Sequence, residues 1–136
     1  MIFLSLSIVI LVSLSIIIHS YAIRSLNGGK STKLSMKYFA YVVAVLMISH
    51  LAQILLFSIF YVVLSDESNF LSGNLDNNFI DYFYFSLSSY STLGIGDVYP
   101  VGNLKIISGI EALLGLIMIA WSATLNFSML MRLNKS

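Results

Sequence analysis

The chain has 136 residues, of which 58% are hydrophobic and only 10% are charged. This composition excludes an ordinary soluble domain, in which about a quarter of the residues are charged, and indicates a protein of the lipid bilayer. The net charge of +1 gives no reason to expect a nucleic-acid partner. Because cysteine is absent, disulfides, thiolate catalysis and cysteine-ligated zinc are excluded, and two histidines far apart in the sequence make a poor metal site.

Three long apolar stretches cover most of the chain, and Glu111 is the one charged residue inside them. They run from Ile2 to Ile23, from Tyr38 to Leu64 and from Ile106 to Leu130. At ~1.5 Å per residue each reaches roughly 33 to 40 Å as a helix, which exceeds a hydrocarbon core of about 30 Å. We therefore predict three membrane-spanning helices. A signal peptide is the alternative for the first, but the lack of a basic start and of a small-x-small cleavage site favours a retained helix.

The charged residues between these stretches predict the topology. Basic residues gather in the loop after the first stretch and in the tail: Arg24, Lys30, Lys33, Lys37, Arg132 and Lys135. Acidic residues without lysine or arginine follow the second stretch: Asp66, Glu67, Asp76 and Asp81. Because cytoplasmic loops are enriched in basic residues, we predict a multi-pass protein, most simply of the plasma membrane, with its N-terminus outside and its C-terminus in the cytoplasm. Gly28 or Gly29 can end the first helix.

The segment from Asn78 to Pro100 is too short for another crossing and too aromatic for an exposed loop. Asn77 or Asn78 can cap a short helix over residues 79–90, whose aromatic residues recur at near-helical spacing. The run Thr92-Leu93-Gly94-Ile95-Gly96-Asp97 follows directly. Non-helical backbone at membrane depth is tolerated only where it is buried in protein or lines a water-filled path. We therefore predict a re-entrant pore loop at residues 92–97.

This run resembles the filter signature of the potassium-channel pore family, T-V-G-Y-G-D followed by proline. The matching residues are Thr92, Gly94, Gly96, Asp97 and Pro100. Composition alone would produce such a match in about one sequence of this length in a thousand. The resemblance extends over the last two-thirds of the chain, and the first helix lies outside it. A tight turn is the alternative for Gly94 and Gly96 considered alone.

The resemblance implies a homotetramer whose backbone carbonyl oxygens replace the hydration shell of potassium ions. The implied ion-coordinating filter comprises Thr92, Leu93, Gly94, Ile95 and Gly96, with K⁺ held at residues 92–95 and Asp97 at the outer mouth. Glycines suit this arrangement because they adopt backbone angles that direct successive carbonyls toward one axis. Two residues depart from the family pattern: Leu93 replaces the usual valine, and Ile95 the usual tyrosine, which leaves the degree of preference for potassium over sodium open.

Several further residues are candidates for supporting the filter. Where family members often carry an acidic partner for the filter aspartate, this chain has Ser88, so we predict that Tyr84 contacts Asp97; an Asp97 that is simply solvated is the alternative. Glu111 falls at filter depth, and we predict that it braces the short helix through Ser86, Ser89 or Tyr90, or else lines the ion path.

Six further residues keep two interpretations each. Gly115 is a possible hinge of the last helix, or a site of close helix packing. His19 and His50 are hydrogen-bonded packing residues or, because histidine titrates near neutral pH, proton sensors. Asn126, Ser122 and Thr124 mediate helix contacts or line the cavity.

Together these predictions describe an all-α membrane protein. A peripheral helix covers residues 1–24 and a basic cytoplasmic loop residues 25–37. The pore domain over 38–131 comprises an outer helix (38–64), an extracellular loop (65–78), a pore helix (79–90), the filter (92–97) and an inner helix (104–131). We expect a potassium channel subunit without a cofactor, potassium being the transported ligand. A weakly selective cation channel and a non-conducting, channel-modifying subunit are the alternatives, and no enzyme is expected because no nucleophile–base pair or metal cluster is visible.

Overall fold

The computed structural model describes residues 2–27, 35–65, 70–76 and 78–134. Its elements are α1 (Ile2–Asn27), α2 (Met36–Ser65), β1 (Leu71–Gly73), α3 (Phe79–Tyr90), β2 (Val98–Pro100) and α4 (Leu104–Leu133). Three of the helices are long and apolar enough to cross a membrane, which confirms the predicted fold class. The helices end one to four residues beyond the predicted stretches, at Asn27, Ser65 and Leu133, in part because flanking polar residues continue the helix. Several residues named in the sequence analysis lie outside the described ranges: Gly28, Gly29, Lys30, Lys33, Asp66, Glu67, Asn77 and Lys135.

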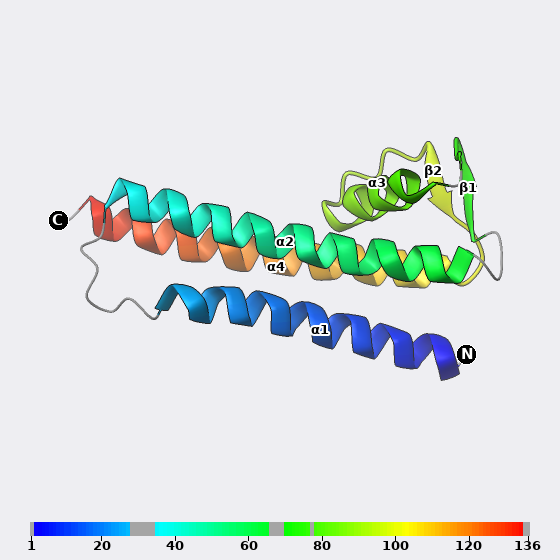
Figure 1. The fold of residues 1–136 in the computed structure, drawn as a ribbon, viewed down its shortest axis with the longest axis horizontal. Coiled ribbons are helices and arrows are strands. Elements are labelled where there is room, and N and C mark those ends of the chain that lie inside the picture. Colours follow the sequence, from blue (N-terminus) through cyan, green and yellow to red (C-terminus); the bar gives the residue numbers. More distant parts are fainter. Residues whose placement is uncertain (1, 28–34, 66–69, 77, 135–136) are drawn as a thin grey trace.

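The pair α2–α4 lies in the middle of the molecule, with α3 on one side of it and α1 on the other (Figure 1). The long helices α2 and α4 run antiparallel and in contact, and α3 packs against both of them. On the opposite side of the pair, α1 lies along its length, with the N-terminus at the end that carries α3 and the strands. The short helix and the loop that follows it therefore stand at one end of the molecule, on the face that α1 leaves free.

One stripe of α1 attaches it to the rest of the molecule. The buried residues of α1 recur every three or four positions: Leu11, Ser15, His19, Ala22 and Leu26. This spacing places them on one helical face, which packs against α2 and α4. The opposite face is apolar and exposed, as at Val9 and Ile17, as expected of a helix that faces lipid.

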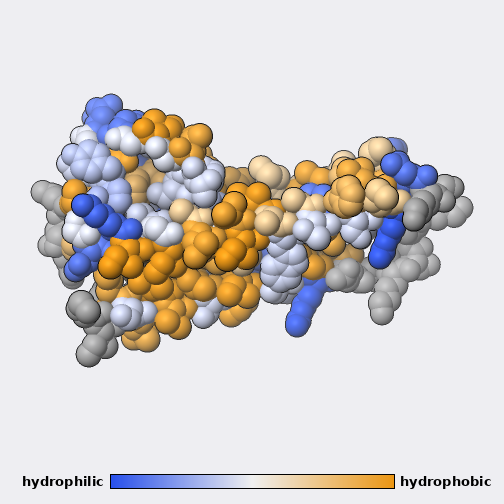
Figure 2. Space-filling model, turned by 180° about the vertical axis from the view of Figure 1, so that it is seen from behind, coloured by the Kyte–Doolittle hydropathy of each residue, from blue (hydrophilic) through white to orange (hydrophobic). Residues whose placement is uncertain are grey.

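Two apolar clusters hold the helices together. The larger one joins α2, α3 and α4 near the loop end and includes Phe57, Tyr61, Phe85 and Ile107. The smaller one lies near the other end, where Leu26 of α1 meets Val42 and Leu46 of α2. On the molecular surface, hydrophobic residues dominate the middle of the molecule, and hydrophilic residues gather toward its ends (Figure 2). This distribution matches a chain that crosses a bilayer.

Part of the predicted extracellular loop forms a β-ribbon. Strand β1 pairs antiparallel with β2, with Leu71 opposite Pro100 and Gly73 opposite Val98. A bond of 2.8 Å from the Val101 amide to the Phe70 carbonyl extends the pairing. Gly73 has φ +117°, and a Cβ there would overlap the carbonyl oxygen of Asp97, so only glycine fits at this turn. The sequence predicts an extracellular loop over residues 65–78 and does not identify these strands, because three-residue strands show no detectable period.

Candidate functional site

The short helix α3 begins at a well-formed cap. The Asn78 side chain accepts from the backbone amides of Ile80 and Asp81, and the Asp81 carboxylate accepts from the Asn78 amide. This reciprocal pair satisfies amides that a helix start leaves unpaired. Asp81 also places a negative charge near the positive end of the helix dipole. The cap therefore fixes where α3 starts. Since α3 has 12 residues, it also determines where the following loop begins.

The backbone of the predicted filter alternates in handedness. Thr92, Gly94 and Gly96 have φ values of +60°, +56° and +87°, whereas Leu93 and Ile95 between them do not adopt positive φ. Such alternation turns successive peptide planes to the same side, so that carbonyl oxygens can form one row. Among the described residues, Thr92 is the one non-glycine residue with positive φ. A β-branched residue is rarely found there, and strain of this kind is concentrated at functional sites.

Ser88 holds the filter backbone against the end of α3. Its carbonyl oxygen accepts from the amides of Leu93 at 3.0 Å and Gly94 at 3.2 Å. Its hydroxyl oxygen accepts from the Ile95 amide at 3.3 Å. The Thr92 amide donates to the Ser89 carbonyl at 3.0 Å. Four consecutive filter amides are thus directed back toward α3, which leaves the carbonyl side of this segment for another ligand.

Asp97, after the filter, is held by Tyr84. The Tyr84 hydroxyl lies 2.9 Å from Oδ1 and 3.0 Å from Oδ2 of Asp97, and the Val98 amide donates to Oδ1 at 3.0 Å. Desolvation, the hydrogen bond to Asp97 and the Asp97 charge raise the pKa of the Tyr84 hydroxyl above 10.0. Tyr84 therefore remains a donor at neutral pH. The contact expected from the sequence is present in the structure, and its effect on the filter remains a prediction.

Glu111 of α4 is fully buried and faces both α3 and α2. Ser86 Oγ lies 2.5 Å from Oε1 of Glu111, and the Tyr61 hydroxyl donates to Oε2. Ser86 Oγ also lies 2.9 Å from the carbonyl oxygen of Ile54. A serine hydroxyl carries one hydrogen, so a proton on Glu111 would satisfy both contacts: Glu111 donates to Ser86, and Ser86 donates to Ile54. Of the three predicted partners, Ser86 makes the contact, and the Tyr90 hydroxyl is engaged elsewhere.

Gly115 lies where α4 passes the end of α3. A Cβ at this position would overlap the carbonyl oxygen of Tyr90 and lie 2.9 Å from its carbonyl carbon. The missing side chain therefore permits close packing between the two helices. This geometry favours the packing interpretation of Gly115, and the hinge interpretation remains a prediction.

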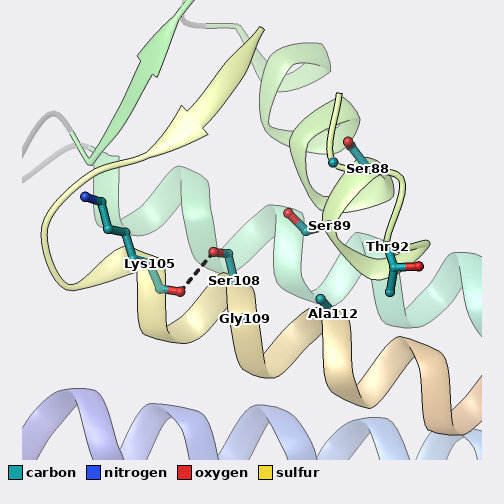
Figure 3. Close-up of a pocket in the computed structure, with 8 residues that line it drawn as sticks. Ser88, Ser89, Thr92, Lys105, Ser108, Gly109 and Ala112 are labelled. Carbon is teal, nitrogen blue, oxygen red and sulfur yellow. Dashed lines mark hydrogen bonds between the residues drawn. The ribbon is translucent and has the colours of Figure 1, made fainter. Parts of the chain in front are cut away.

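An open pocket of about 320 Å³ lies between the filter loop and the first half of α4 (Figure 3). Ser88, Ser89 and Thr92 line one side of it, and Lys105, Ser108 and Ala112 the other. The neighbouring filter side chains are also uncovered, with 67% of Leu93 and 55% of Ile95 exposed. This flank of the loop is therefore unfilled in the single chain.

Sequence reasoning missed several polar contacts between the helices. Tyr61 is the second partner of Glu111, and its signal was its spacing from Ile54, Phe57 and Ser58 on one face of α2. The two histidines, distant in the sequence, lie with their ring centroids 5.2 Å apart. They are hydrogen-bonded, His19 to Ser49 and His50 to Tyr90 and Ser122. In the described part of the chain, no group of three or more acidic or histidine residues could hold a metal ion.

Comparisons with known proteins bear on this site. A family model described as "Ion channel" matches residues 49–132, more than half of the chain. A 29-residue stretch, 21% of the chain, is 52% identical to "Potassium channel K2" of Plasmodium falciparum (isolate 3D7) and 55% identical to the protein of that name in Plasmodium berghei (strain Anka). The match spans only 2% of the length of either relative. No solved structure matches.

The matched range contains most of α2 and all of the pore loop and α4 up to Arg132. The first helix lies outside it, as the sequence resemblance predicts. Three membrane-spanning helices and a short half-buried helix, followed by a loop with alternating handedness, are the parts expected of a pore. The chain is a membrane protein that belongs to the ion channel family.

Proposed function

We propose that the chain is a subunit of a homotetrameric potassium channel that conducts ions passively through residues 92–96. The observation that carries this proposal is the alternating φ of Thr92, Gly94 and Gly96, combined with the binding of the intervening amides to Ser88 and Ser89. With the amides engaged on one side, the carbonyls form the natural ligands for a dehydrated cation. The likeness to two proteins named potassium channels supports the choice of ion.

Two further features support a cation rather than an anion. The C-terminal end of α3, which carries the negative end of the helix dipole, immediately precedes the filter. Asp97 places a carboxylate at the other end of the filter, where it would attract cations at the outer mouth. The uncovered Leu93 and Ile95 side chains support an assembly, because apolar filter side chains need neighbours to hold the width of the path.

The acidic end of the molecule is proposed to face outward. The N-terminus and α3 lie at the same end (Figure 1), and the basic residues Arg24 and Arg132 lie in the last turns of α1 and α4, at the other end. By the excess of basic residues on cytoplasmic sides, the C-terminus lies inside and the N-terminus outside. The plasma membrane is the proposed location.

Flux from the purified protein in liposomes tests the proposal. Under opposed potassium and sodium gradients, we expect potassium to pass in preference to sodium, and Gly94→Ala to abolish the flux. A Cβ at Gly94 meets nothing within 4 Å in the single chain, so this variant should still fold. A loss of flux would then arise from the added methyl groups where the four filter loops approach one another in the proposed tetramer.

Gly102→Ala is the matched control. Gly102 has the same φ of +56° and equally open surroundings but lies outside the filter. It should carry the same backbone strain and retain flux. Unchanged flux in Gly94→Ala would contradict conduction through the filter.

A weakly selective cation channel is the second candidate, and Ile95 is the observation that favours it. The family's usual tyrosine would add a hydroxyl to anchor the filter, which isoleucine cannot supply. Reversal potentials under bi-ionic potassium and sodium conditions separate the two candidates: no preference for potassium would favour the second. Absence of any flux from a correctly folded protein would favour the non-conducting, channel-modifying subunit.

A further inference from the structure

Six buried side chains from four helices form a closed ring of hydrogen bonds at the inner end of α3. Gln53 Nε2 lies 3.3 Å from Ser49 Oγ, which lies 3.1 Å from His19 Nδ1. His19 Nε2 lies 3.4 Å from Ser122 Oγ, which lies 3.0 Å from His50 Nε2. His50 Nδ1 lies 2.9 Å from the Tyr90 hydroxyl, which lies 3.1 Å from Gln53 Oε1. The ring members are Ser49, His50 and Gln53 of α2, His19 of α1, Tyr90 of α3 and Ser122 of α4.

A main-chain carbonyl fixes the direction of the ring. The amide nitrogen of Gln53 also lies 3.1 Å from the carbonyl oxygen of Ser49. A carbonyl oxygen only accepts, so the nitrogen of the Gln53 amide must be on this side and its oxygen on the side of Tyr90. The amide oxygen in turn only accepts, and the Tyr90 hydroxyl must therefore donate to it.

The remaining hydrogens follow because each hydroxyl has only one. Tyr90 donates to Gln53 and so accepts from His50, which must carry its proton on Nδ1. His50 Nε2 is then an acceptor and takes the hydrogen of Ser122. Ser122 consequently accepts from His19, whose proton lies on Nε2, and His19 Nδ1 accepts from Ser49, which accepts from Gln53. Every ring donor and acceptor is used once when both histidines are neutral and hold opposite tautomers.

The ring meets the filter through Tyr90. Tyr90 is the last residue of α3, two positions before Thr92, and its side chain is 1% exposed. Its main chain is held by close contact with Gly115 of α4, and its hydroxyl is held by His50 and Gln53 of α2. His19, which closes the ring, is fully buried on the inward stripe of α1. The helix α1, which lies outside the predicted pore domain, is thus linked by continuous hydrogen bonds to Tyr90, two positions before the filter.

We propose that this ring positions the inner end of the filter, with His50 and His19 as positioning residues, and that α1 is thereby a working part of the pore rather than a peripheral anchor. The effect of the ring on ion flux rests on the proposed channel function. The ring itself and its histidine tautomers rest on the hydrogen-bond geometry alone. Because the ring is cooperative, removing one member changes the proton positions of members that it does not touch.

Nitrogen NMR of the histidine-labelled full chain in nanodiscs at neutral pH tests the chemistry. The chain has two histidines, and the backbone connections of each one to its sequence neighbours assign the two ring signals without altering the ring. We expect the proton of His19 on Nε2 and that of His50 on Nδ1. A proton on Nε2 of His50, or two protons on either ring, would overturn the proposed ring even if no variant could be made.

Tyr90→Phe tests whether the ring acts as a unit. Without the Tyr90 hydroxyl, His50 has no acceptor for its Nδ1 proton, and donation from Nε2 to Ser122 becomes favourable. Ser122 then turns toward His19, and we expect His19 to change tautomer although it does not touch Tyr90. Tyr38→Phe is the control, since the Tyr38 hydroxyl bonds the Leu26 carbonyl at 2.6 Å, outside the ring. An unchanged His19 signal in Tyr90→Phe would overturn the coupling.

Liposome flux tests the consequence for the filter. An asparagine side chain places its amide near the position of histidine Nδ1, and a glutamine side chain near that of Nε2. His50→Asn keeps a donor toward Tyr90 and should therefore lose less potassium flux and selectivity than His50→Gln, which we expect to lose severalfold. Equal flux in both variants and in the wild type would overturn the positioning role. Absence of flux from the wild type would instead remove the channel proposal and leave the tautomer result standing.

Discussion

At the scale of single residues, Ser88 shows how one side chain and one carbonyl organise a whole loop. The position that often carries an acid in the potassium-channel family here supplies two acceptors for three filter amides. An acid would have reached outward to Asp97, a role that Tyr84 takes from the preceding turn of α3. The short, neutral side chain of Ser88 can therefore bind the Ile95 amide while Tyr84 binds Asp97.

Ser88→Ala removes the hydroxyl acceptor of the Ile95 amide and leaves the carbonyl contacts in place. The loss of one such bond costs about 0.5–1.5 kcal/mol, which should loosen the filter at Ile95 and reduce its preference for potassium over sodium. Reversal potentials measure this change. Ser91→Ala is the matched control, because the Ser91 hydroxyl lies 2.7 Å from the Leu87 carbonyl oxygen and 3.4 Å from the Ser88 carbonyl oxygen and so acts as a donor, not as the acceptor of a filter amide. Equal selectivity in the two variants would mean that Ser88 Oγ does not support the filter.

Glu111 is expected to act on the stability of the pore and not on its choice of ion. Glu111→Gln can accept from Tyr61 and donate to Ser86, as a protonated carboxyl would, so we expect little change in thermal stability or cation preference. Glu111→Ala leaves the buried Tyr61 hydroxyl without its partner, at a cost of about 1–3 kcal/mol. Thermal unfolding in detergent and reversal potentials measure the two effects. A large selectivity change in Glu111→Gln would place Glu111 on the ion path instead.

The residues predicted from the sequence are those whose chemistry is unusual for their surroundings. A carboxyl group inside a membrane helix and an aspartate after two glycines stand out in any apolar sequence, and their depth could be estimated from the helix rise. Tyr61 and Ser49 do not stand out, because tyrosine and serine recur throughout the sequence, and Gln53 marks a polar position without revealing its partners. Their partners lie on other helices, and only the packing of α1 and α2 shows which faces meet.

At the scale of helices and strands, the long elements could be predicted and the short ones could not. Hydropathy over twenty or more residues identifies a membrane helix with little ambiguity. The three-residue strands β1 and β2 carry no such signal, and they pair because Gly73 allows a close approach to Asp97. The face of α1 that packs against α2 and α4 carries the polar residues Ser15 and His19. Because most of α1 is apolar on every face, its hydrophobic period does not show which face packs inward.

Gly115→Ala tests whether this glycine serves packing. A methyl group would overlap the Tyr90 carbonyl oxygen, so α4 must shift away from α3, and overpacking of this kind typically costs about 1–3 kcal/mol. We expect lower thermal stability and a disturbed filter. Gly109→Ala is the control on the same helix, because nothing lies within 4 Å of a Cβ there in the single chain. Normal stability with altered opening in Gly115→Ala would favour the hinge.

At the scale of the whole molecule, one chain presents two different faces. On the side that carries α1, the exposed face of that helix is largely apolar, as at Val9 and Ile17, which suits lipid. The opposite side carries the filter loop, with its exposed Leu93 and Ile95 and the open pocket beside Ala112. Exposed apolar side chains beside strained, polar backbone are poorly suited to lipid, since unpaired backbone groups are costly there. This side is therefore the one that other subunits would cover.

Ala112→Trp tests that assignment. Ala112 lines the pocket between the filter loop and α4, and an indole there would occupy the space that a neighbouring subunit fills in the proposed tetramer. We expect loss of the tetramer, measured by native mass spectrometry in detergent, together with loss of flux. Ala52→Trp is the matched control, because Ala52 lines the shallow groove between α1 and α2 on the side proposed to face lipid. It should leave four chains together. A tetramer that survives Ala112→Trp and dissociates with Ala52→Trp would show that the subunits meet through α1 instead.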